Sequence, residues 1–389
     1  MVSRKSSVRD TETGNELTRW RELSMRIRRV WHSATGKPPV CEHLQVWAAA
    51  RPDTDCKILV SPRRFTRPLP ETIESIVDRQ YVDRQVAKQD EKYLVRLSRA
   101  KIVGRDGLVI LPDGAYSSES VYTRSVLEHA PDYYAPQRRP TIAKPGNYFS
   151  LLVIWSKSGN YYHWMHDTLE RLFRVRPHLP ENIRYIVPVD LQPVHLETLR
   201  VLGIEQDQLC PFSGEEVWEL ETLYFSNCTT HSGHDWREAD EWLRDRMLEA
   251  YRIDSKVPTR RLFLSRRLAS TRRVINEPLV EEYLEQFGFE TCTPETLSFR
   301  DQVELFSQAQ VVVSMHGAGL TNILFAPAGL IVVDMIPPSK MENAYLFWTM
   351  AVELRHRYWY FGAEDVAGGR DAYVPVEKLA KTIELIQLQ

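Results

Sequence analysis

The chain has 389 residues, of which 43% are hydrophobic and 26% are charged, so it is long enough for two domains with separate cores. A formal net charge of -2 gives no general reason to expect nucleic acid or an anionic membrane as a partner, so any basic ligand site has to be local. The five cysteines are widely spaced without a C-x-x-C pair, which argues against a disulfide framework and a zinc ribbon and favours a reducing cytosol.

The first 40 residues are polar, basic and rich in Ser and Arg, and they contain no apolar signal core. We expect an N-terminal extension here that is partly disordered or wraps the surface. The longest apolar runs are well short of a bilayer span. These features predict a cytoplasmic protein with at most a peripheral association at the inner face of the plasma membrane.

Residues 101–114 carry the signals of a β-rich segment. Two apolar runs, 101–104 and 108–111, flank Arg105-Asp106-Gly107, which predicts a hairpin. From Tyr148 onward, strands and helices alternate, and this order predicts a parallel sheet. We expect strands at 148–155, 184–189 and 220–226, and helices at 162–175, 195–202 and 238–252.

A second alternating series follows the best linker candidate, residues 256–259. Its expected strands are 261–265, 289–292, 311–314 and 330–335, and its expected helices are 277–286, 299–309 and 376–388. The pattern predicts an α/β fold with three parts. These are an extension at 1–40, an N-terminal α/β domain with the β-rich segment at 41–255, and a C-terminal Rossmann-like domain at 256–389.

A glycine turn ends the strand at 311–314. After His316 come Gly317, Ala318 and Gly319, and a short amphipathic segment, 320–325, follows. The free N–H groups of the first helical turn would point at this turn, so a phosphate can approach the bare glycine backbone closely. His316 and Asn322 would add side-chain hydrogen bonds. The alternative is a tight turn whose glycines serve only backbone geometry, since a lone G-x-G is not the full dinucleotide fingerprint.

Four arginines follow another predicted strand end, where the ligand-facing loops of open parallel sheets lie. They are Arg266, Arg267, Arg272 and Arg273. Forked guanidinium groups bind phosphate bidentately, so a nucleotide diphosphate is a good match, and the alternative is a solvated basic loop. Asp334, at the end of the strand after the glycine turn, would accept hydrogen bonds from ribose hydroxyls, or it is an ordinary strand-end carboxylate.

His163 and Asp167 are four residues apart on a predicted helix, which places them on one face and within reach of each other. His166 lies close to the same face. A histidine oriented by a carboxylate can take a proton from a hydroxyl group near neutral pH, which is general-base chemistry. Either His163 or Asp167 can carry the proton. The alternative is that these residues only stabilise the helix or its packing.

Two patterns suggest a metal only weakly. Asp53-Thr54-Asp55 matches a D-x-D pattern in a loop far from the phosphate motifs, and the loop with His231, His234 and Asp235 has no clear third ligand. We therefore expect no metal ion and no cofactor.

The sequence resembles glycosyltransferase family 61, in its bacterial capsular or exopolysaccharide type. The resemblance depends on three blocks and Gln302: residues 160–167, residues 264–276 with Ser265 and Asn276, and residues 315–329 around the glycine turn. It implies a GT-B fold, in which two Rossmann-like domains face each other across a cleft. It further implies that the arginine block and the glycine turn bind a nucleotide-sugar and that the histidine block supplies the base.

The sequence thus predicts an inverting, metal-independent transferase that moves a sugar, preferably from a UDP-sugar, to a glycan or glycolipid in polysaccharide biosynthesis. Two other classes stay open. One is a nucleotide-sugar-binding protein without turnover, and the other is a hydrolase that uses the same pocket. Formation of a sugar-transfer product would distinguish the transferase from both.

Overall fold

The computed structural model describes residues 38–52, 54–75, 77–121, 127, 135–152, 160–227, 237–254, 257–366 and 371–387. Outside these residues lie the predicted N-terminal extension up to residue 37, Asp53 of the D-x-D match, the loop with His231, His234 and Asp235, and Lys256 of the predicted linker.

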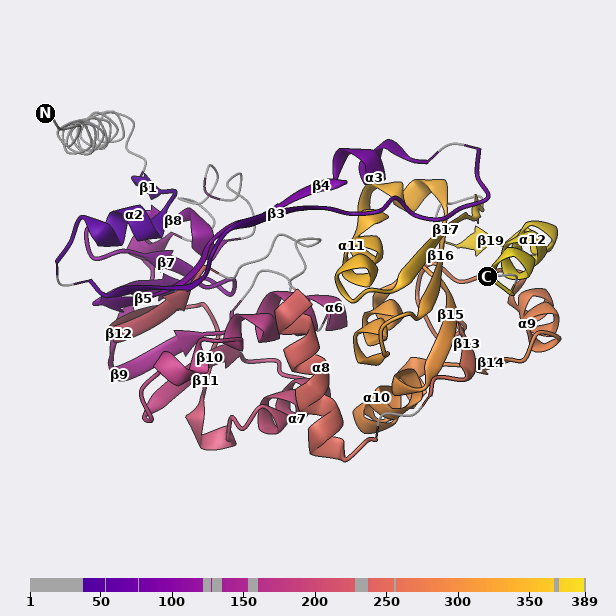
Figure 1. Ribbon diagram of the computed structural model, residues 1–389. Helices are drawn as coiled ribbons and strands as arrows, with labels where there is room; N and C mark the ends of the chain where they lie inside the picture. Colours follow the sequence, from indigo (N-terminus) through magenta and orange to yellow (C-terminus); the bar gives the residue numbers. More distant parts are fainter. Residues whose placement is uncertain are drawn as a thin grey trace, which may run out of the picture.

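The C-terminal part of the chain forms a five-stranded sheet in which every pairing is parallel (Figure 1). Its strand order is β14-β13-β15-β16-β17. The bounds are Arg260–Leu264 for β13, Phe289–Cys292 for β14, Ala309–Met315 for β15, Ile331–Ile336 for β16 and Arg357–Gly362 for β17. The chain leaves β13 to one side and returns to its other side, so β13 and β15 flank a topological switch point.

Helices cover both faces of this sheet, as a parallel sheet requires. They are α9 (Glu277–Glu285), α10 (Phe299–Ser307), α11 (Tyr345–Glu353), α12 (Val376–Gln387) and the 3₁₀ helix η9 (Ala318–Phe325). Neighbouring residues of β13 face opposite layers. Phe263 packs in one core with α9 and α12, and Leu262 packs in another with α10 and α11. Successive residues of a buried strand are therefore mostly apolar, as the Val311-Val312-Val313 run is.

The N-terminal part forms a ten-stranded mixed sheet. Its strands are β1 (Val40–Cys41), β2 (Cys56–Val60), β5 (Lys92–Ser98), β6 (Lys101–Val103), β7 (Leu108–Ile110), β8 (Tyr116–Ser117), β9 (Thr141–Ser150), β10 (Ile183–Pro188), β11 (Leu209–Phe212) and β12 (Val217–Ser226). The strands from β12 through β9 and β10 to β11 pair in parallel, whereas β12 pairs with β5 and β6 in antiparallel fashion. The predicted hairpin is confirmed as β6 and β7.

One core joins the two parts. The described helices on the N-terminal side include α2 (Leu44–Ala49), α7 (Pro193–Val201), α8 (Arg237–Tyr251) and α6 (Tyr161–His163). The expected single helix over 162–175 is instead α6, a π-helical turn η4 (Trp164–Thr168) and a 3₁₀ turn η5 (Leu169–Leu172). Tyr162 and Trp164 share the largest buried cluster with Phe299 and Phe347 of the C-terminal part. The histidine block therefore lies where the two parts pack together.

An arm from the N-terminal part also reaches the C-terminal sheet (Figure 1). It leaves through β3 (Arg63–Thr66), carries α3 (Arg79–Asp83) and returns through β4 (Val86–Gln89). Glu71 bridges to Trp359 of β17, and the buried Tyr81 packs edge-on against Trp348 with ring centroids 5.3 Å apart. Residues 68–75 and 77–85 thus lie in the predicted N-terminal domain by sequence but pack on the C-terminal part.

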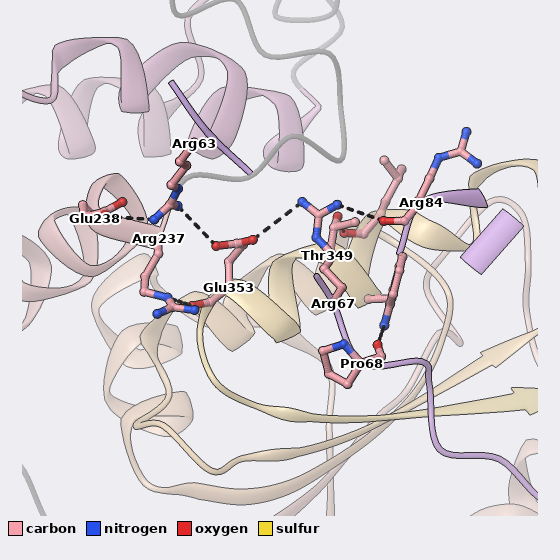
Figure 2. Close-up of polar contacts among 10 residues, drawn as sticks. Arg63, Arg67, Pro68, Arg84, Arg237, Glu238, Thr349 and Glu353 are labelled. Carbon is pink, nitrogen blue, oxygen red and sulfur yellow. Dashed lines mark hydrogen bonds and ion pairs between the residues drawn. The ribbon is translucent and has the colours of Figure 1, made fainter. Parts of the chain in front are cut away.

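The base of the arm is fixed by a buried ionic cluster around Glu353 at the end of α11 (Figure 2). Its carboxylate lies 3.6 Å from Arg63 Nη2 and 3.6 Å from Arg67 Nη2. Glu353 and Arg67 are both buried, with 1% and 5% of the side chain exposed. Arg63 also pairs with the more exposed Glu238 of α8 at 3.1 Å, so the cluster ties the arm to two helices.

The α/β class predicted from the sequence is confirmed, and β14 has the predicted bounds. Helix α11 and strand β17 were not predicted. Helix α11 is largely buried and so lacks the polar face that marks an amphipathic helix. The division of the chain at residue 255 stays a prediction, because residues 255–256 are outside the described part.

Two simpler expectations concern membranes and disulfides. Within the described residues, no helix is both long and apolar enough to cross a bilayer. The four cysteines of the described chain are free, namely Cys41, Cys56, Cys210 and Cys292, and Cys228 lies outside it.

Removing Glu353 should destabilise the protein strongly. Glu353→Ala leaves the buried Arg67 without its carboxylate, and breaking a buried ion pair in this way typically costs about 3–5 kcal/mol. The matched control is Glu238→Ala, which removes the exposed partner of Arg63 and should cost less than about 1 kcal/mol. Urea unfolding of both variants measures the difference. Equal midpoints for the two variants would contradict this role for the cluster.

Candidate active site

The carboxyl ends of β13 and β15 place two predicted motifs side by side. The two strands pair in parallel, with Leu264 opposite Ser314. The arginine block continues from the first strand and the glycine turn from the second. Ligands of open parallel sheets bind outside the carboxyl ends of strands at such a switch point. Strand order therefore favours the same place that the motifs predicted.

Gly317 and Arg266 touch across this switch point. A Cβ atom on Gly317 would collide with Nη1 of Arg266. The φ angle of Gly317 is 172°, an extended value open to any residue, so the glycine serves the close approach of the Arg266 side chain and not a special backbone angle. Gly319 differs, because its Cβ would lie an ordinary 3.7 Å from Leu264 Cδ1. The protein itself would therefore tolerate a side chain at residue 319, and the predicted approach of a phosphate to Gly319 stays a prediction.

Arg266 and Arg272 form a pair of like charges beside the turn. Burial, together with the neighbouring Arg272, lowers the pKa of Arg266 to about 10. Burial also lowers the pKa of Arg272, while Asp334 acts in the opposite direction. Arg266 donates its Nε–H and Nη2–H to the carbonyl oxygens of Arg272 and Thr271, at 3.0 and 2.9 Å. Arg272 has a left-handed backbone with a φ of 59°, which is costly for a residue with a side chain. An anion placed between these guanidinium groups would relieve their repulsion.

The other two arginines of the block point elsewhere. Arg267 is exposed and pairs with Glu281 and Glu277 of α9. Arg273 is also exposed and pairs with Asp371 at 2.7 Å, which raises the pKa of the arginine. The predicted set of four arginines is therefore divided. Arg266 lies on Gly317 with Arg272 beside it, whereas Arg267 and Arg273 pair with carboxylates.

Ser265 and Asn276 shape the arginine loop from within. The buried Ser265 donates its hydroxyl to Glu277 Oε1 at 2.5 Å, and Glu277 Oε2 accepts the Arg266 N–H at 3.1 Å. The Asn276 amide exchanges two hydrogen bonds with the backbone of Val374 at 2.8 and 3.0 Å. The side chains of both residues, which were predicted to bind a ligand, thus form hydrogen bonds within the protein. Glu277 was not predicted as a site residue, although it directly follows Asn276 at the start of a predicted helix.

His316 and Asp334 form a buried chain below the glycine turn. His316 Nδ1 lies 2.8 Å from Asp334 Oδ2, and the Tyr358 hydroxyl donates to the same oxygen at 2.7 Å. Asp334 is completely buried. The expectation that it accepts hydrogen bonds from ribose is therefore wrong, because ribose cannot reach it. Asp334 instead orients the ring of His316. Tyr358, which also binds Asp334, had no local signal in the sequence.

Asn322 joins the two parts of the chain. Its Oδ1 accepts a hydrogen bond from the Tyr161 hydroxyl at 2.8 Å, and its Nδ2 donates to Gln302 Oε1 at 2.9 Å. Asn322 is completely buried. Its predicted role in ligand binding is therefore corrected to a structural one. Ala318, also predicted, begins η9, a 3₁₀ helix where the sequence predicted an ordinary helical segment.

The predicted pair of His163 and Asp167 is present. His163 Nδ1 lies 2.6 Å from Asp167 Oδ2. The histidine side chain is 13% exposed and the carboxylate 4%, so Asp167 lies behind the ring. A carboxylate on Nδ1 fixes the orientation of the ring and favours the tautomer with its proton on that nitrogen.

His166 does not join this pair. It is buried, and its Nδ1 lies 2.7 Å from Glu170 Oε1 and 3.2 Å from Asp240 Oδ1. Burial opposes a charge on the ring, but Asp240 and Glu170 raise the pKa of His166 well above its ordinary value. A buried histidine that holds its proton is a poor general base. The predicted catalytic role of His166 is therefore replaced by membership of this acidic cluster.

A short aromatic path connects the pair to the glycine turn. The Tyr162 ring contacts His163 at 5.3 Å and Phe347 at 5.6 Å, and Phe347 contacts His316 at 5.0 Å, each between ring centroids. With the hydrogen bond from Tyr161 to Asn322, this places the histidine block beside the glycine turn. Tertiary packing brings both predicted motifs into one region.

Comparison with known proteins supports one family for this region. Residues 161–333 match the family model "Glycosyltransferase 61". This match supports membership of the chain in glycosyltransferase family 61. The matched range holds every predicted site residue except Asp334.

Curated relatives of the chain are glycosyltransferases as well. Beta-1,2-xylosyltransferase XAX1 of Oryza sativa subsp. japonica is 26% identical over 244 residues, which cover 55% of this chain and 43% of the rice protein. Protein O-linked-mannose beta-1,4-N-acetylglucosaminyltransferase 2 of Mus musculus is 39% identical over 77 residues, 19% of this chain and 13% of the mouse protein. The chain spans less than half the length of these relatives. Together the matches support a transferase of family 61.

Tyr161→Phe should loosen the junction between the two parts. It leaves Asn322 Oδ1 buried without its donor, and such an unsatisfied group typically costs about 1–3 kcal/mol. Tyr373→Phe is the matched control, because Tyr373 is exposed. Urea unfolding should show a lower midpoint for the first variant and an unchanged midpoint for the control. A wild-type midpoint in Tyr161→Phe would remove this hydrogen bond from the account.

Proposed function

We propose that the chain is an inverting glycosyltransferase that moves a sugar from a nucleotide-sugar, preferably a UDP-sugar, to a hydroxyl of a glycan or glycolipid. The observation that carries the proposal is the meeting of two chemically different motifs. Arg266 and Arg272 adjoin the glycine turn, and the His163–Asp167 pair lies beside that turn across Tyr162 and Phe347. The first motif suits a diphosphate and the second suits a hydroxyl proton.

In the donor site, the diphosphate lies against the extended backbone of Gly317. Arg266 and Arg272 donate charge-assisted hydrogen bonds to its oxygens, and the two guanidinium groups supply the positive charge that offsets the leaving diphosphate. The donor site thus needs no metal ion to neutralise phosphate. His316, held by Asp334, orients the turn from below.

In the acceptor site, His163 is the general base. The acceptor hydroxyl gives its proton to Nε2 as its oxygen attacks the anomeric carbon of the donor, and the nucleoside diphosphate leaves from the opposite side. Asp167 stabilises the imidazolium that forms, because its carboxylate is 2.6 Å from Nδ1. A single displacement of this kind inverts the configuration of the sugar.

We propose a GT-B arrangement for the whole. In it the five-stranded sheet holds the donor and the ten-stranded sheet faces the acceptor, with the arm and the α6–η5 segment between them. Names of the relatives support a glycan acceptor, since they include a beta-1,2-xylosyltransferase and an O-linked-mannose N-acetylglucosaminyltransferase. Polysaccharide biosynthesis is the role we propose on this basis.

The direct test is a transfer assay after a donor screen. Specific binding raises the melting temperature by mass action, so thermal shifts over UDP-, GDP-, CMP- and dTDP-sugars identify the donor. We expect the UDP-sugars to give the shift and a glycan acceptor to yield a sugar-linked product. Binding without turnover would indicate a binding protein. Release of free sugar at a rate independent of acceptor would indicate a hydrolase.

Arg266→Ala and Arg272→Ala should each weaken UDP binding. A lost hydrogen bond to a charged group is worth about 1.5–3 kcal/mol, which corresponds to roughly a ten- to hundredfold loss of affinity. Arg267→Ala and Arg273→Ala are the matched controls, because these exposed arginines pair with carboxylates on other elements. Calorimetric titration with UDP in the presence of EDTA measures all four and also tests whether donor binding needs a metal. Equal affinities across the four variants would place the diphosphate elsewhere.

His163→Ala and Asp167→Asn should slow turnover and leave UDP affinity unchanged. Loss of a general base typically costs about 10²–10⁴-fold in rate. Because the two residues act as an oriented pair, the double variant should be scarcely slower than the slower single variant. His178→Ala is the control, since this histidine contacts Lys57 away from the pair. A purely structural role would instead lower the melting temperature with normal turnover per folded molecule.

A further inference from the structure

Three ionisable side chains meet in the interior beside the proposed catalytic pair. His166 comes from η4, Glu170 from η5 and Asp240 from α8, and their exposed fractions are 2%, 1% and 0%. His166 Nδ1 lies 2.7 Å from Glu170 Oε1 and 3.2 Å from Asp240 Oδ1. One potential ligand atom from each residue lies within 4.8 Å of the others. Side chains from η4, η5 and α8 thus meet at one place in the interior.

This cluster is short of positive charge. Two buried carboxylates face one imidazole, and burial of charge without compensation is costly. Among the described residues, Glu170 Oε2 and Asp240 Oδ2 are buried and accept no hydrogen bond. Both oxygens belong to residues of the group whose potential ligand atoms lie close together. An additional cation would satisfy them.

Among the described residues, protons compensate part of this negative charge. Burial and the nearby Asp240 raise the pKa of Glu170 well above its ordinary value. The pKa of His166 is likewise raised, because Asp240 and Glu170 outweigh the effect of its burial.

We propose that His166, Glu170 and Asp240 bind a divalent transition-metal ion such as Zn²⁺ or Mn²⁺. One imidazole nitrogen with two carboxylate oxygens is a ligand set that these ions accept. Mg²⁺ and Ca²⁺ prefer sites made of oxygen alone, so the nitrogen ligand disfavours them. The separations of 2.7 and 3.2 Å from Nδ1 are also close to those between adjacent ligands of one ion, at bond lengths of about 2.0–2.2 Å.

The ion would have a structural and positioning role. It would link η4 and η5 to α8, and Asp167 directly follows His166 in η4. An ion here fixes the π-helical turn that carries Asp167 without touching the reacting atoms. It is separate from the donor site, where Arg266 and Arg272 supply the charge, and the proposal does not depend on the transferase activity.

Metal content of the purified full-length chain tests the site. The protein is stripped of metal under denaturing conditions, refolded with excess Zn²⁺ or Mn²⁺, dialysed and analysed by mass spectrometry for metal. We expect one tightly held ion per chain, a higher melting temperature in the loaded form, and an affinity that rises with pH because bound protons have to leave. Glu170→Gln and Asp240→Asn should lose the ion, whereas Asp245→Asn on the exposed side of α8 should keep it.

Two outcomes would overturn the proposal. A wild-type chain that retains no metal would show that the cluster holds only protons. Equal metal content in wild type and Asp240→Asn would place the ion at another site. If a variant fails to fold, X-ray absorption of the loaded wild-type chain decides the question. It should show an imidazole nitrogen at about 2.0–2.1 Å from zinc, and a spectrum without imidazole would refute the site.

Discussion

The parallel pairing of β13 with β15 is the constraint on which the donor site depends. Each strand is short and buried on both faces, so its register is fixed by apolar side chains that pack into two separate cores. With the register fixed, the loops that follow the two strands start side by side. Arg266 can then lie on the bare backbone of Gly317, and a phosphate site can form from two segments that are about fifty residues apart in sequence.

Polar side chains at this site fall into two groups. Ser265, Asn276 and Asn322 are buried and form their hydrogen bonds with other groups of the protein. Arg266 and Arg272 are held close to each other in spite of their like charge, one by backbone carbonyls and the other by a left-handed backbone. The first group holds the loops in place so that the second group stays together. Residues of both kinds fall inside the region that matches family 61, and the ligand contacts that we propose come from the second group.

Buried side chains also hold the junction between the two parts of the chain in place. Tyr161 and Asn322 connect the two parts through one buried hydrogen bond, and the rings of Tyr162 and Phe347 pack against each other there. The arm makes a separate connection, through the ion pair of Arg67 with Glu353. The acidic cluster of His166, Glu170 and Asp240 lies on the N-terminal side of this junction. The proposed base on one part and the proposed diphosphate site on the other can cooperate only if this junction holds them at a fixed separation.

The sequence by itself determined the class of fold and the positions of its motifs. Continuous apolar runs such as Val311-Val312-Val313 predict buried parallel strands, and their alternation with amphipathic helices predicts an α/β sheet, because these signals are local. The buried helix α11 escaped prediction for the same reason, since it lacks a polar face. The spacing of His163 and Asp167 likewise predicted their contact, which needs only one turn of chain.

Only the tertiary structure decided which motif residues face a ligand. Arg266 and Arg267 are neighbours in sequence, yet one lies on Gly317 and the other pairs with α9. His163 and His166 lie on the same segment, yet burial beside Asp240 of a distant helix gives His166 a different role. Asp334 has the sequence position of a ribose ligand but is enclosed by His316 and Tyr358. In each case a charged or polar side chain is directed by long-range partners and by access to solvent, and the residue type and its spacing carry no information on either.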